Sequence, residues 1–252
     1  MRLAKAEAIY RPNLLINGDF QVWQRGESTT LSNVSETGYK YLADRWCRYF
    51  SRTSSASETY EKVSNGMKYT STPSSNATIT QLLETGLKSG NKYTLSASVN
   101  DIIHIMTFDG QVDKSEGILS YAKSATTIPH DRIMFSISNN DIVNWVKLEV
   151  GSIATPFIPR LYAEEFTMCE RYYQIIDNLY LSRYNYEAAS TLSYCNGFPF
   201  RTKMRVIPSV TATCGYGEVG SQATDNAIKF CYIGRDLPAI EGAIFTLDAE
   251  IK

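Results

Sequence analysis

The chain has 252 residues, of which 43% are hydrophobic and 20% charged, the usage of a globular protein rather than a disordered or fibrous one. Lys and Arg number 25 against 26 Asp and Glu, so the formal net charge of -1 provides no overall field to attract nucleic acid or an anionic membrane. Five cysteines without a C-x-x-C pair favour neither a disulfide framework nor a zinc site.

Membrane insertion and secretion also lack a signal. The first residues, MRLAKAEAIYRP, contain no apolar core of a signal peptide, and no run of about 18 apolar residues occurs anywhere. Tyr occurs 17 times, Ser and Thr are abundant, and long helical stripes are scarce. These residue preferences predict a mainly β protein.

The first predicted strand lies in NLLINGDFQVWQRG, residues Asn13 to Gly26. Its alternation places Phe20 and Val22 on one face and, on the other, Asp19, Gln21 and Trp23. Asn17-Gly18 then reads as a bend or bulge that enters the strand. Asp19 has no histidine or second acid nearby in sequence, so the pattern indicates a structural stretch rather than a catalytic loop.

A second short motif, ADRW, follows at residues 43–46. An acid and a base that flank a large aromatic residue are typical of a local ion pair over a core side chain. We therefore expect Asp44 and Arg45 to pair above a buried Trp46, and we do not assign them to a ligand site.

Further strands are predicted in KYTLSASV (residues 92–99), RIMFSIS (132–138) and IVNWVKLEV (142–150), because apolar and polar residues alternate in each. In the last of these, Trp145, Lys147 and Glu149 share a face opposite Val146 and Leu148. Short strands at regular spacing, separated by Gly and Asn turn signals, favour a sandwich or jelly roll. We expect residues 1–160 to form a β-sandwich domain of the jelly-roll type.

The segment TPFIPR marks a domain boundary, because Pro156 and Pro159 stiffen it into an extended connector. Residues 161–176 then predict a linker helix, with Glu164 and Glu165 in the first turn, where the helix dipole favours acids. Five residues at helical spacing give this helix an aromatic stripe: Phe166, Cys169, Tyr172, Tyr173 and Ile176. Residues 177–252 are predicted to form a smaller β-sandwich domain.

Motifs of the common enzyme classes do not occur. The chain has two histidines and lacks a G-x-S-x-G elbow, an H-E-x-x-H helix and a P-loop, so it is predicted not to be an enzyme and no catalytic residue is assigned. A recognition surface is the alternative for the second domain, where Tyr residues are interleaved with Ser and Asn, a composition suited to binding. The candidate glycan-binding residues are Tyr180, Tyr184, Tyr186 and Tyr194, although the same tyrosines would also pack across neighbouring strands.

Several segments together resemble the tail-fibre or receptor-binding-like proteins of tailed bacteriophages. These are NLLINGDFQVWQRG with YLADRW, the passage VKLEVGSIATPFIPRLYAEEFTMCERYYQ, and FPFRTKMRVIPSVTAT, which occur in that order and span most of the chain. The ends of the first domain are also similar to carbohydrate-binding modules of the jelly-roll type. That resemblance implies a structural calcium near the first strand, with Asp19 as a weak candidate ligand, but Asn144 stands where such modules often have an acid. No metal site and no cofactor are therefore assigned.

The phage resemblance implies a non-enzymatic virion structural protein, assembled in the cytoplasm of the bacterial host. Its partners would be itself, as a homotrimer that meets along the aromatic stripe of the helix, other virion proteins of the tail, baseplate or capsid, and host surface polysaccharide. The first alternative is a capsid decoration or head-fibre protein that grips neighbouring capsid subunits. The second is a virion-associated enzyme that degrades glycans.

Overall fold

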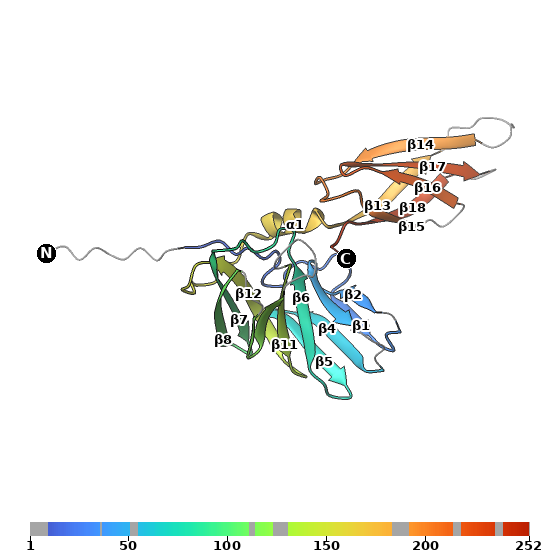
Figure 1. Cartoon of the computed structure of the whole chain (residues 1–252). Coiled ribbons are helices and arrows are strands. Elements are labelled where there is room, and N and C mark those ends of the chain that lie inside the picture. The colour runs from blue at the N-terminus through green and yellow to red at the C-terminus, as the bar shows by residue number, and fades with distance from the viewer. Residues whose placement is uncertain are drawn as a thin grey trace. The chain divides into compact units, whose positions relative to one another are not determined.

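The computed structural model describes residues 10–35, 37–50, 55–110, 114–122, 131–182, 192–213, 218–234 and 239–251. Within these ranges the chain is mainly β, with antiparallel sheets and one α-helix, as the residue preferences predict (Figure 1). The chain divides into two compact units, Met1–Glu165 with Ile251–Lys252, and Phe166–Glu250. We call them unit 1 and unit 2.

Unit 1 contains two six-stranded antiparallel sheets in its described part. In spatial order, sheet I consists of β1 (Ser28–Leu31), β4 (Ser57–Val63), β5 (Gly66–Thr72), β12 (Ile142–Val150), β7 (Lys92–Val99) and β8 (Ile102–Asp109). Sheet II consists of β2 (Gly38–Tyr41), β3 (Trp46–Phe50), β6 (Ala77–Leu82), β11 (Arg132–Ile137), β10 (Leu119–Ala122) and β9 (Lys114–Glu116). Both sheets contribute to one hydrophobic core.

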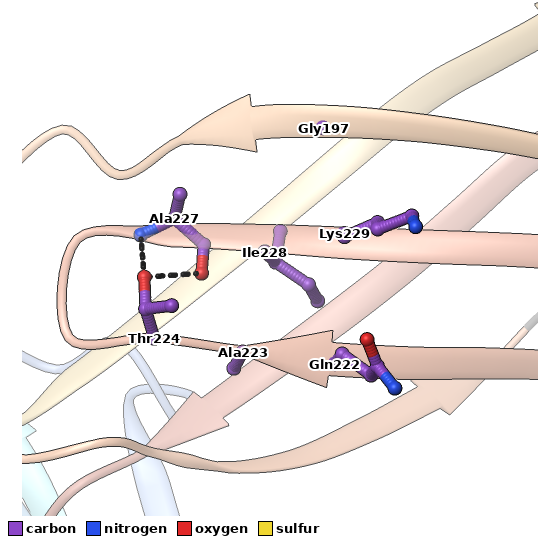
Figure 2. A pocket seen from close by; sticks show the side chains of 7 residues that line it. All are labelled: Gly197, Gln222, Ala223, Thr224, Ala227, Ile228 and Lys229. Atoms are coloured by element: carbon purple, nitrogen blue, oxygen red, sulfur yellow. Dashed lines mark hydrogen bonds between the residues drawn. The ribbon is translucent and has the colours of Figure 1, made fainter.

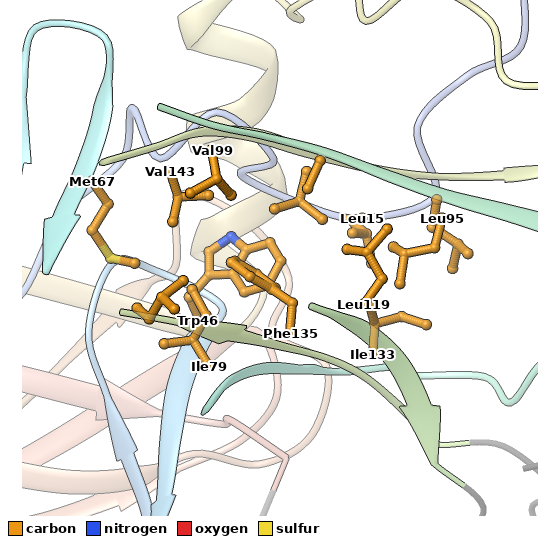
Figure 3. Packing of buried hydrophobic residues seen from close by; sticks show 14 of the residues in the cluster. Leu15, Trp46, Met67, Ile79, Leu95, Val99, Leu119, Ile133, Phe135 and Val143 are labelled. Carbon is orange, nitrogen blue, oxygen red and sulfur yellow. The ribbon is translucent and has the colours of Figure 1, made fainter. Parts of the chain in front are cut away.

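Trp46 lies at the centre of this core (Figure 3). Its ring meets Phe135 edge to face at 5.8 Å and Phe20 at 5.0 Å, which are favourable distances for aromatic pairs. Its indole nitrogen donates a hydrogen bond of 2.7 Å to the carbonyl of Asn17, so the one polar atom of the side chain is satisfied. The prediction that Trp46 is a core residue is confirmed.

The predicted ion pair between Asp44 and Arg45 is wrong, because Asp44 has another partner. Asp44 is buried and pairs with Arg25, at 3.3 Å from Nη1 to Oδ1, and not with its neighbour Arg45. The Arg45 guanidinium instead donates to the Leu82 carbonyl at 2.6 Å. Arg45 has a φ of 70°, in the left-handed region, which is uncommon for a residue other than glycine.

The opening stretch, Asn13 to Gly26, is not the strand that its alternation predicts. It contains bends and turns, with positive φ at Asn17 (56°) and Phe20 (58°). The two asparagine side chains replace strand partners: Asn13 Oδ1 accepts from the Leu148 N–H at 2.9 Å, and Asn17 Nδ2 donates to the carbonyls of Val22 and Asp44. A short amphipathic pattern cannot distinguish such side-chain bonding from a strand ladder.

β12 differs from the predicted alternation at one position. A β-bulge interrupts its pairing with β7, where Val143 faces Val99 but Trp145 faces Ser98. The extra residue is Asn144, and it shifts Val143 to the core side, where the side chain is fully buried beside Val146. Strict alternation would place Val143 on the same face as Trp145, so the bulge moves Val143 to the opposite face, whereas Trp145 and Val146 lie on opposite faces as expected.

Unit 2 contains two three-stranded antiparallel sheets, β13-β18-β15 and β14-β17-β16 in spatial order. The strands are β13 (Tyr173–Ser182), β14 (Leu192–Pro199), β15 (Ser209–Thr213), β16 (Glu218–Ala223), β17 (Ala227–Gly234) and β18 (Ala239–Asp248). Phe200, Met204, Ile228, Phe245 and Leu247 belong to its own hydrophobic core.

The helix α1 (Tyr162–Glu170) is shorter than the predicted 161–176. After Glu170 the chain turns, and Tyr173 begins strand β13. Consecutive Tyr-Tyr and Ile-Ile pairs suit a strand at least as well as a helix, because aromatic and β-branched residues pack well on a pleated surface. Helical spacing alone extended the predicted helix too far.

Candidate binding groove

An open groove of about 530 Å³ lies on unit 1 at one end of sheet I. We call it the Trp145 groove. It is lined by residues 19–21 and 62–66 together with Ser98, Asp101, Asn144, Trp145, Phe157 and Pro159. These residues come from the opening stretch, two hairpin turns, β12 and the connector after β12, so the fold brings together segments that are far apart in the sequence.

The bulge at Asn144 positions one wall of the groove. Its Oδ1 accepts hydrogen bonds of 3.0 Å from the Ser98 hydroxyl and the Asp101 N–H, and its Nδ2 donates to the Asn65 carbonyl at 3.2 Å. One amide thereby joins the β7–β8 turn to the β4–β5 turn. Gly66 permits this close approach, because a Cβ on it would lie 2.0 Å from the Val143 carbonyl oxygen.

The Asn17-Gly18 turn positions the opposite wall. The Val146 N–H donates to the Gly18 carbonyl at 2.7 Å, and a Cβ on Gly18 would lie 2.6 Å from the Val146 oxygen, so the turn packs directly on β12. The next residues, Asp19 and Phe20, line the groove. A φ of 58° is rare for a residue as bulky as phenylalanine, and this backbone strain is held in place by the burial of the Phe20 ring.

The connector after β12 supplies the aromatic part of the groove. The Phe157 ring stacks on Trp145, with ring centroids 5.0 Å apart and planes inclined by 7°. Thr155 fixes the connector, because its N–H and hydroxyl donate to the Glu149 carboxylate at 2.8 and 2.6 Å. Lys147 donates to the carbonyls of Thr155 and Pro156, and lies 3.3 Å from Glu149 in an almost fully buried ion pair.

Arg160 secures the far end of the connector. Its guanidinium donates to the Leu15 carbonyl at 2.9 Å, to the Asn13 carbonyl, and to the Glu165 carboxylate at 3.0 Å. Glu165 also accepts a hydrogen bond from the Asn17 N–H. The start of the helix and the opening stretch are thus joined through one buried carboxylate.

The groove contains charged side chains of both signs, and they differ in their partners and exposure. Lys62 forms an ion pair with Glu27 at 3.1 Å, which offsets its charge. Asp19 accepts hydrogen bonds of 3.1 Å from Gln21, and partial burial raises the pKa of its carboxyl above the ordinary value, against the lowering effect of Gln21 and of the Arg160 charge. Asp101 is exposed at the turn between β7 and β8.

This arrangement suits the binding of a neutral polar molecule with an apolar face. Aromatic rings offer a large surface at a small cost in side-chain entropy, and nearby amide, hydroxyl and carboxylate groups can bond to hydroxyls of a ligand. Among the described residues, no group of three or more His, Cys, Asp or Glu side chains could hold a metal ion. Asp19, the candidate calcium ligand, lies in the groove with Gln21 on its carboxylate.

Unit 2 has a hollow of about 560 Å³ between β14, β17 and β16 (Figure 2). Small residues line much of it, among them Gly197, Ala223 and Ala227. Gln222 and Lys229 also line it, and they face each other on the neighbouring strands β16 and β17. Thr224 closes the hairpin beside it, accepting from the Ala227 N–H at 3.1 Å. Among the described side chains that line this hollow none is aromatic, so the Trp145 groove is the stronger candidate.

The tyrosines predicted to bind glycan cannot be placed in either hollow. Tyr184 and Tyr186 lie outside the described residues, and Tyr180 and Tyr194 belong to β13 and β14, where their side chains are outside the description. Apart from Asp19, a candidate calcium ligand, the groove residues were not assigned to a binding site from the sequence. Trp145 on the polar face of its strand and Phe157 between two prolines were the available signals.

Of the five residues of the predicted oligomer contact, Phe166 and Cys169 lie in α1, Tyr172 lies in the turn after it, and Tyr173 and Ile176 lie in β13. Cys169, Tyr172 and Tyr173 are buried within a single chain, and Ile176 is half-buried against the core of unit 2. Phe166 is also half-buried. The side chains that suggested a shared helix surface are therefore largely covered in one copy, and the trimer stays a prediction.

Comparison of the chain with family models, curated proteins and solved structures finds no match. In the described part of the chain, no helix has the length and apolarity needed to cross a membrane.

Proposed function

We propose that the protein is a non-enzymatic attachment module that binds a glycan in the Trp145 groove of unit 1. The observation that carries this proposal is the stacked Trp145–Phe157 pair, set among the side chains of Asp19, Gln21 and Asn144. A sugar ring has one apolar face of C–H groups and a rim of hydroxyls, so an aromatic stack with polar neighbours matches both parts. The open form of the groove suits a unit within a longer polysaccharide rather than a small enclosed ligand.

The resemblance to phage tail-fibre proteins gives this binding a biological setting. We propose that the chain is a virion component, with unit 1 a jelly-roll-like module, and that it attaches the particle to host surface polysaccharide. Weak single sites are sufficient there, because several copies on one particle bind the same surface with much greater strength than one copy. The two-sheet arrangement of unit 1 supports this assignment.

The test is a glycan array of bacterial surface polysaccharides with the purified full chain, followed by calorimetry on the glycan that binds. Trp145→Ala should weaken binding about tenfold or more, because it removes the stacking surface. Trp145→Phe should retain much of the affinity. Tyr49→Ala is the matched control, since Tyr49 is an exposed aromatic residue on sheet II, 39% exposed, outside the groove.

Two results would overturn the proposal. If no polysaccharide binds while the protein saturates stripped capsids, a decoration role replaces it. If a polysaccharide binds and Trp145→Ala leaves the affinity unchanged, binding occurs elsewhere on the chain, with the tyrosines of unit 2 as the next candidates.

One observation favours glycan hydrolysis as a second candidate function. Asp19 and Asp101 both line the groove, and the pKa of Asp19 is raised by burial, as is usual for the general acid of a glycosidase. The binding proposal takes precedence because Asp101 is exposed and no feature raises its reactivity. Release of reducing ends from a bound polysaccharide, abolished by Asp19→Asn, would decide for the enzyme.

A further inference from the structure

The backbone pairing of β14 and β17 in unit 2 places two cysteines directly opposite each other. The two strands are antiparallel neighbours, and their ladder shows no register shift from one end to the other. Within this ladder Cys195 faces Cys231. The two residues are far apart in the sequence, so their spacing does not reveal the pair, and it is the fold that brings them together.

A hydrogen bond at the end of the ladder fixes the kind of pair that these cysteines form. The Phe200 N–H donates to the Asn226 carbonyl at 2.8 Å, and the two residues continue the register of β14 and β17, so they are a hydrogen-bonded pair. Hydrogen-bonded and non-hydrogen-bonded pairs alternate along an antiparallel ladder. Cys195 lies an odd number of residues before Phe200, so Cys195 and Cys231 are a non-hydrogen-bonded pair.

The other neighbour of β17 gives the same result. The Thr224 N–H donates to the Ala227 carbonyl at 2.8 Å, and the ladder between β16 and β17 then pairs Cys231 with Gly220. Cys231 lies an even number of residues after Ala227, so its pair with Gly220 is a hydrogen-bonded one. The N–H and C=O of Cys231 are therefore directed to β16 rather than to β14, as the first count requires.

A non-hydrogen-bonded antiparallel pair has the spacing of a cross-strand disulfide. Its Cα atoms lie about 4.5 Å apart, within the roughly 4.4 to 6.8 Å that a disulfide spans. On the third strand of the sheet the residue in line with the pair is Gly220, which adds no side chain beside it. The backbone can therefore hold this bond without a change of register.

The two cysteines also belong to the exposed face of their sheet. Successive residues of a strand lie on opposite faces, so Cys195 shares a face with Gly197, and Cys231 shares it with Lys229. Gly197 and Lys229 are exposed, whereas Ile228 on the other face is fully buried (Figure 2). A reagent in solution meets this face of the sheet first.

The remaining cysteines differ from this pair. Cys47 and Cys169 are fully buried, and burial in apolar surroundings keeps a thiol unreactive. Cys214 lies outside the described residues.

We propose that Cys195 and Cys231 are a modification site, a dithiol that closes to a cross-strand disulfide by exchange with a small-molecule disulfide. The thiolate of one cysteine attacks the small disulfide and releases one small thiol, and the thiolate of the other attacks the mixed disulfide and releases the second. Two protein thiols thereby become one disulfide, while the small disulfide becomes two thiols.

The bond would join β14 to β17 and close the chain between them into a loop. Such a loop restricts the unfolded state of unit 2, so unit 2 becomes more stable in oxidising surroundings than in reducing ones. This effect is independent of any ligand of unit 1.

Thiol counting on the full chain tests the proposal. After incubation with oxidised glutathione, the wild-type chain should have lost two of its five thiols, with a mass lower by two hydrogen atoms. Digestion without reductant should release one linked pair of peptides, which contain Cys195 and Cys231. Cys195→Ser and Cys231→Ser should each abolish the link, whereas Cys214→Ser should retain it.

A shift of one cysteine by one residue is the matched control. Cys195→Ser/Asn196→Cys keeps the number of thiols, but it moves the cysteine to the other face of β14, opposite Phe230. This variant should form no internal link in the same incubation, and circular dichroism confirms that its fold is retained.

Hydrogen exchange measures the effect on unit 2. Peptides from β14 and β17 should exchange about tenfold more slowly in the oxidised chain than in the reduced chain, and peptides from unit 1 should not change. Four results would each overturn the proposal: a wild-type chain that keeps all its thiols, a stable adduct of glutathione on either cysteine, a link that involves Cys214 or a second copy of the chain, or an internal link in the shifted variant.

Discussion

The opening stretch, Asn13 to Gly26, and strand β12 look alike in sequence but fold differently. Both alternate apolar and polar residues, and they lie side by side, joined by bonds such as that from the Val146 N–H to the Gly18 carbonyl. β12 pairs with β7 along most of its length, whereas backbone N–H groups of the opening stretch, those of Leu15 and Val22, donate to the side chains of Asn13 and Asn17. Polar residues in a strand-like pattern can therefore indicate groups that bond to backbone rather than a face in contact with solvent.

Both segments contain buried polar side chains. Substituting one such side chain in each segment compares how much they contribute to stability. Unfolding of unit 1 is measurable by itself, because the three tryptophans, Trp23, Trp46 and Trp145, all lie in it. Fluorescence in a denaturant titration then reports the free energy of unfolding of unit 1 in the intact chain.

The largest expected effect is that of Lys147→Met on β12. It should lower the free energy of unfolding by about 3 to 5 kcal/mol, because it leaves the Glu149 carboxylate buried without its cation. Lys92→Met is the control: it breaks the exposed pair with Asp109, and should cost less than about 1 kcal/mol. Equal losses in the two variants would show that the burial of Lys147 and Glu149 has no special role.

Asn17→Ala should have a somewhat smaller effect, on the opening stretch. It should lower the free energy of unfolding by about 3 kcal/mol, because the Val22 N–H and the Asp44 carbonyl lose their side-chain partner in the interior. Asn33→Ala separates this effect from backbone strain, since Asn33 has a similar φ of 50° but is exposed. If both variants lose the same stability, the positive φ of the backbone and not side-chain hydrogen bonding accounts for the effect of Asn17→Ala.

Asp19→Asn should have the smallest effect on stability, and in the opposite direction. The pKa of Asp19 is higher in the folded chain than its ordinary value of 3.8, so the folded state binds the proton more tightly than the unfolded state. The native chain thus loses stability as pH rises through this range, and Asp19→Asn should be more stable at pH near 7. The gain should disappear below the ordinary pKa. A denaturant series over pH checks this, with Asp109→Asn as the exposed control.

The sequence predicts the class of fold better than the groove. The strand patterns of KYTLSASV, RIMFSIS and IVNWVKLEV correspond to β7, β11 and β12, because their apolar residues alternate toward the hydrophobic core. In β7 the polar residues Thr94, Ser96 and Ser98 are buried as well, which the alternation does not show. The bulge at Asn144 was not predictable, since one extra residue becomes visible only when the partner strand is known. The groove depends on that bulge and on Phe157 returning to Trp145, a contact between a strand and a connector that periodicity does not encode.

The end of the helix is a second feature that the local sequence pattern does not determine. Tyr172 and Tyr173 fit both a helical stripe and a strand, and the structure places the second at the start of β13. The choice depends on the pairing of β13 with β18, which begins with Tyr173 facing Asp248, far away in the chain. Local spacing could not contain that information.

The two-residue turn between β7 and β8 has a consequence for the order of folding. Strands joined so closely meet within microseconds, whereas β12 comes much later in the chain and must close a long loop to reach β7. We expect the hairpin to form early, with both of its edges unpaired. Arrival of β12 then covers the β7 edge, so the centre of sheet I is completed late, after the chain between β8 and β12 has been made.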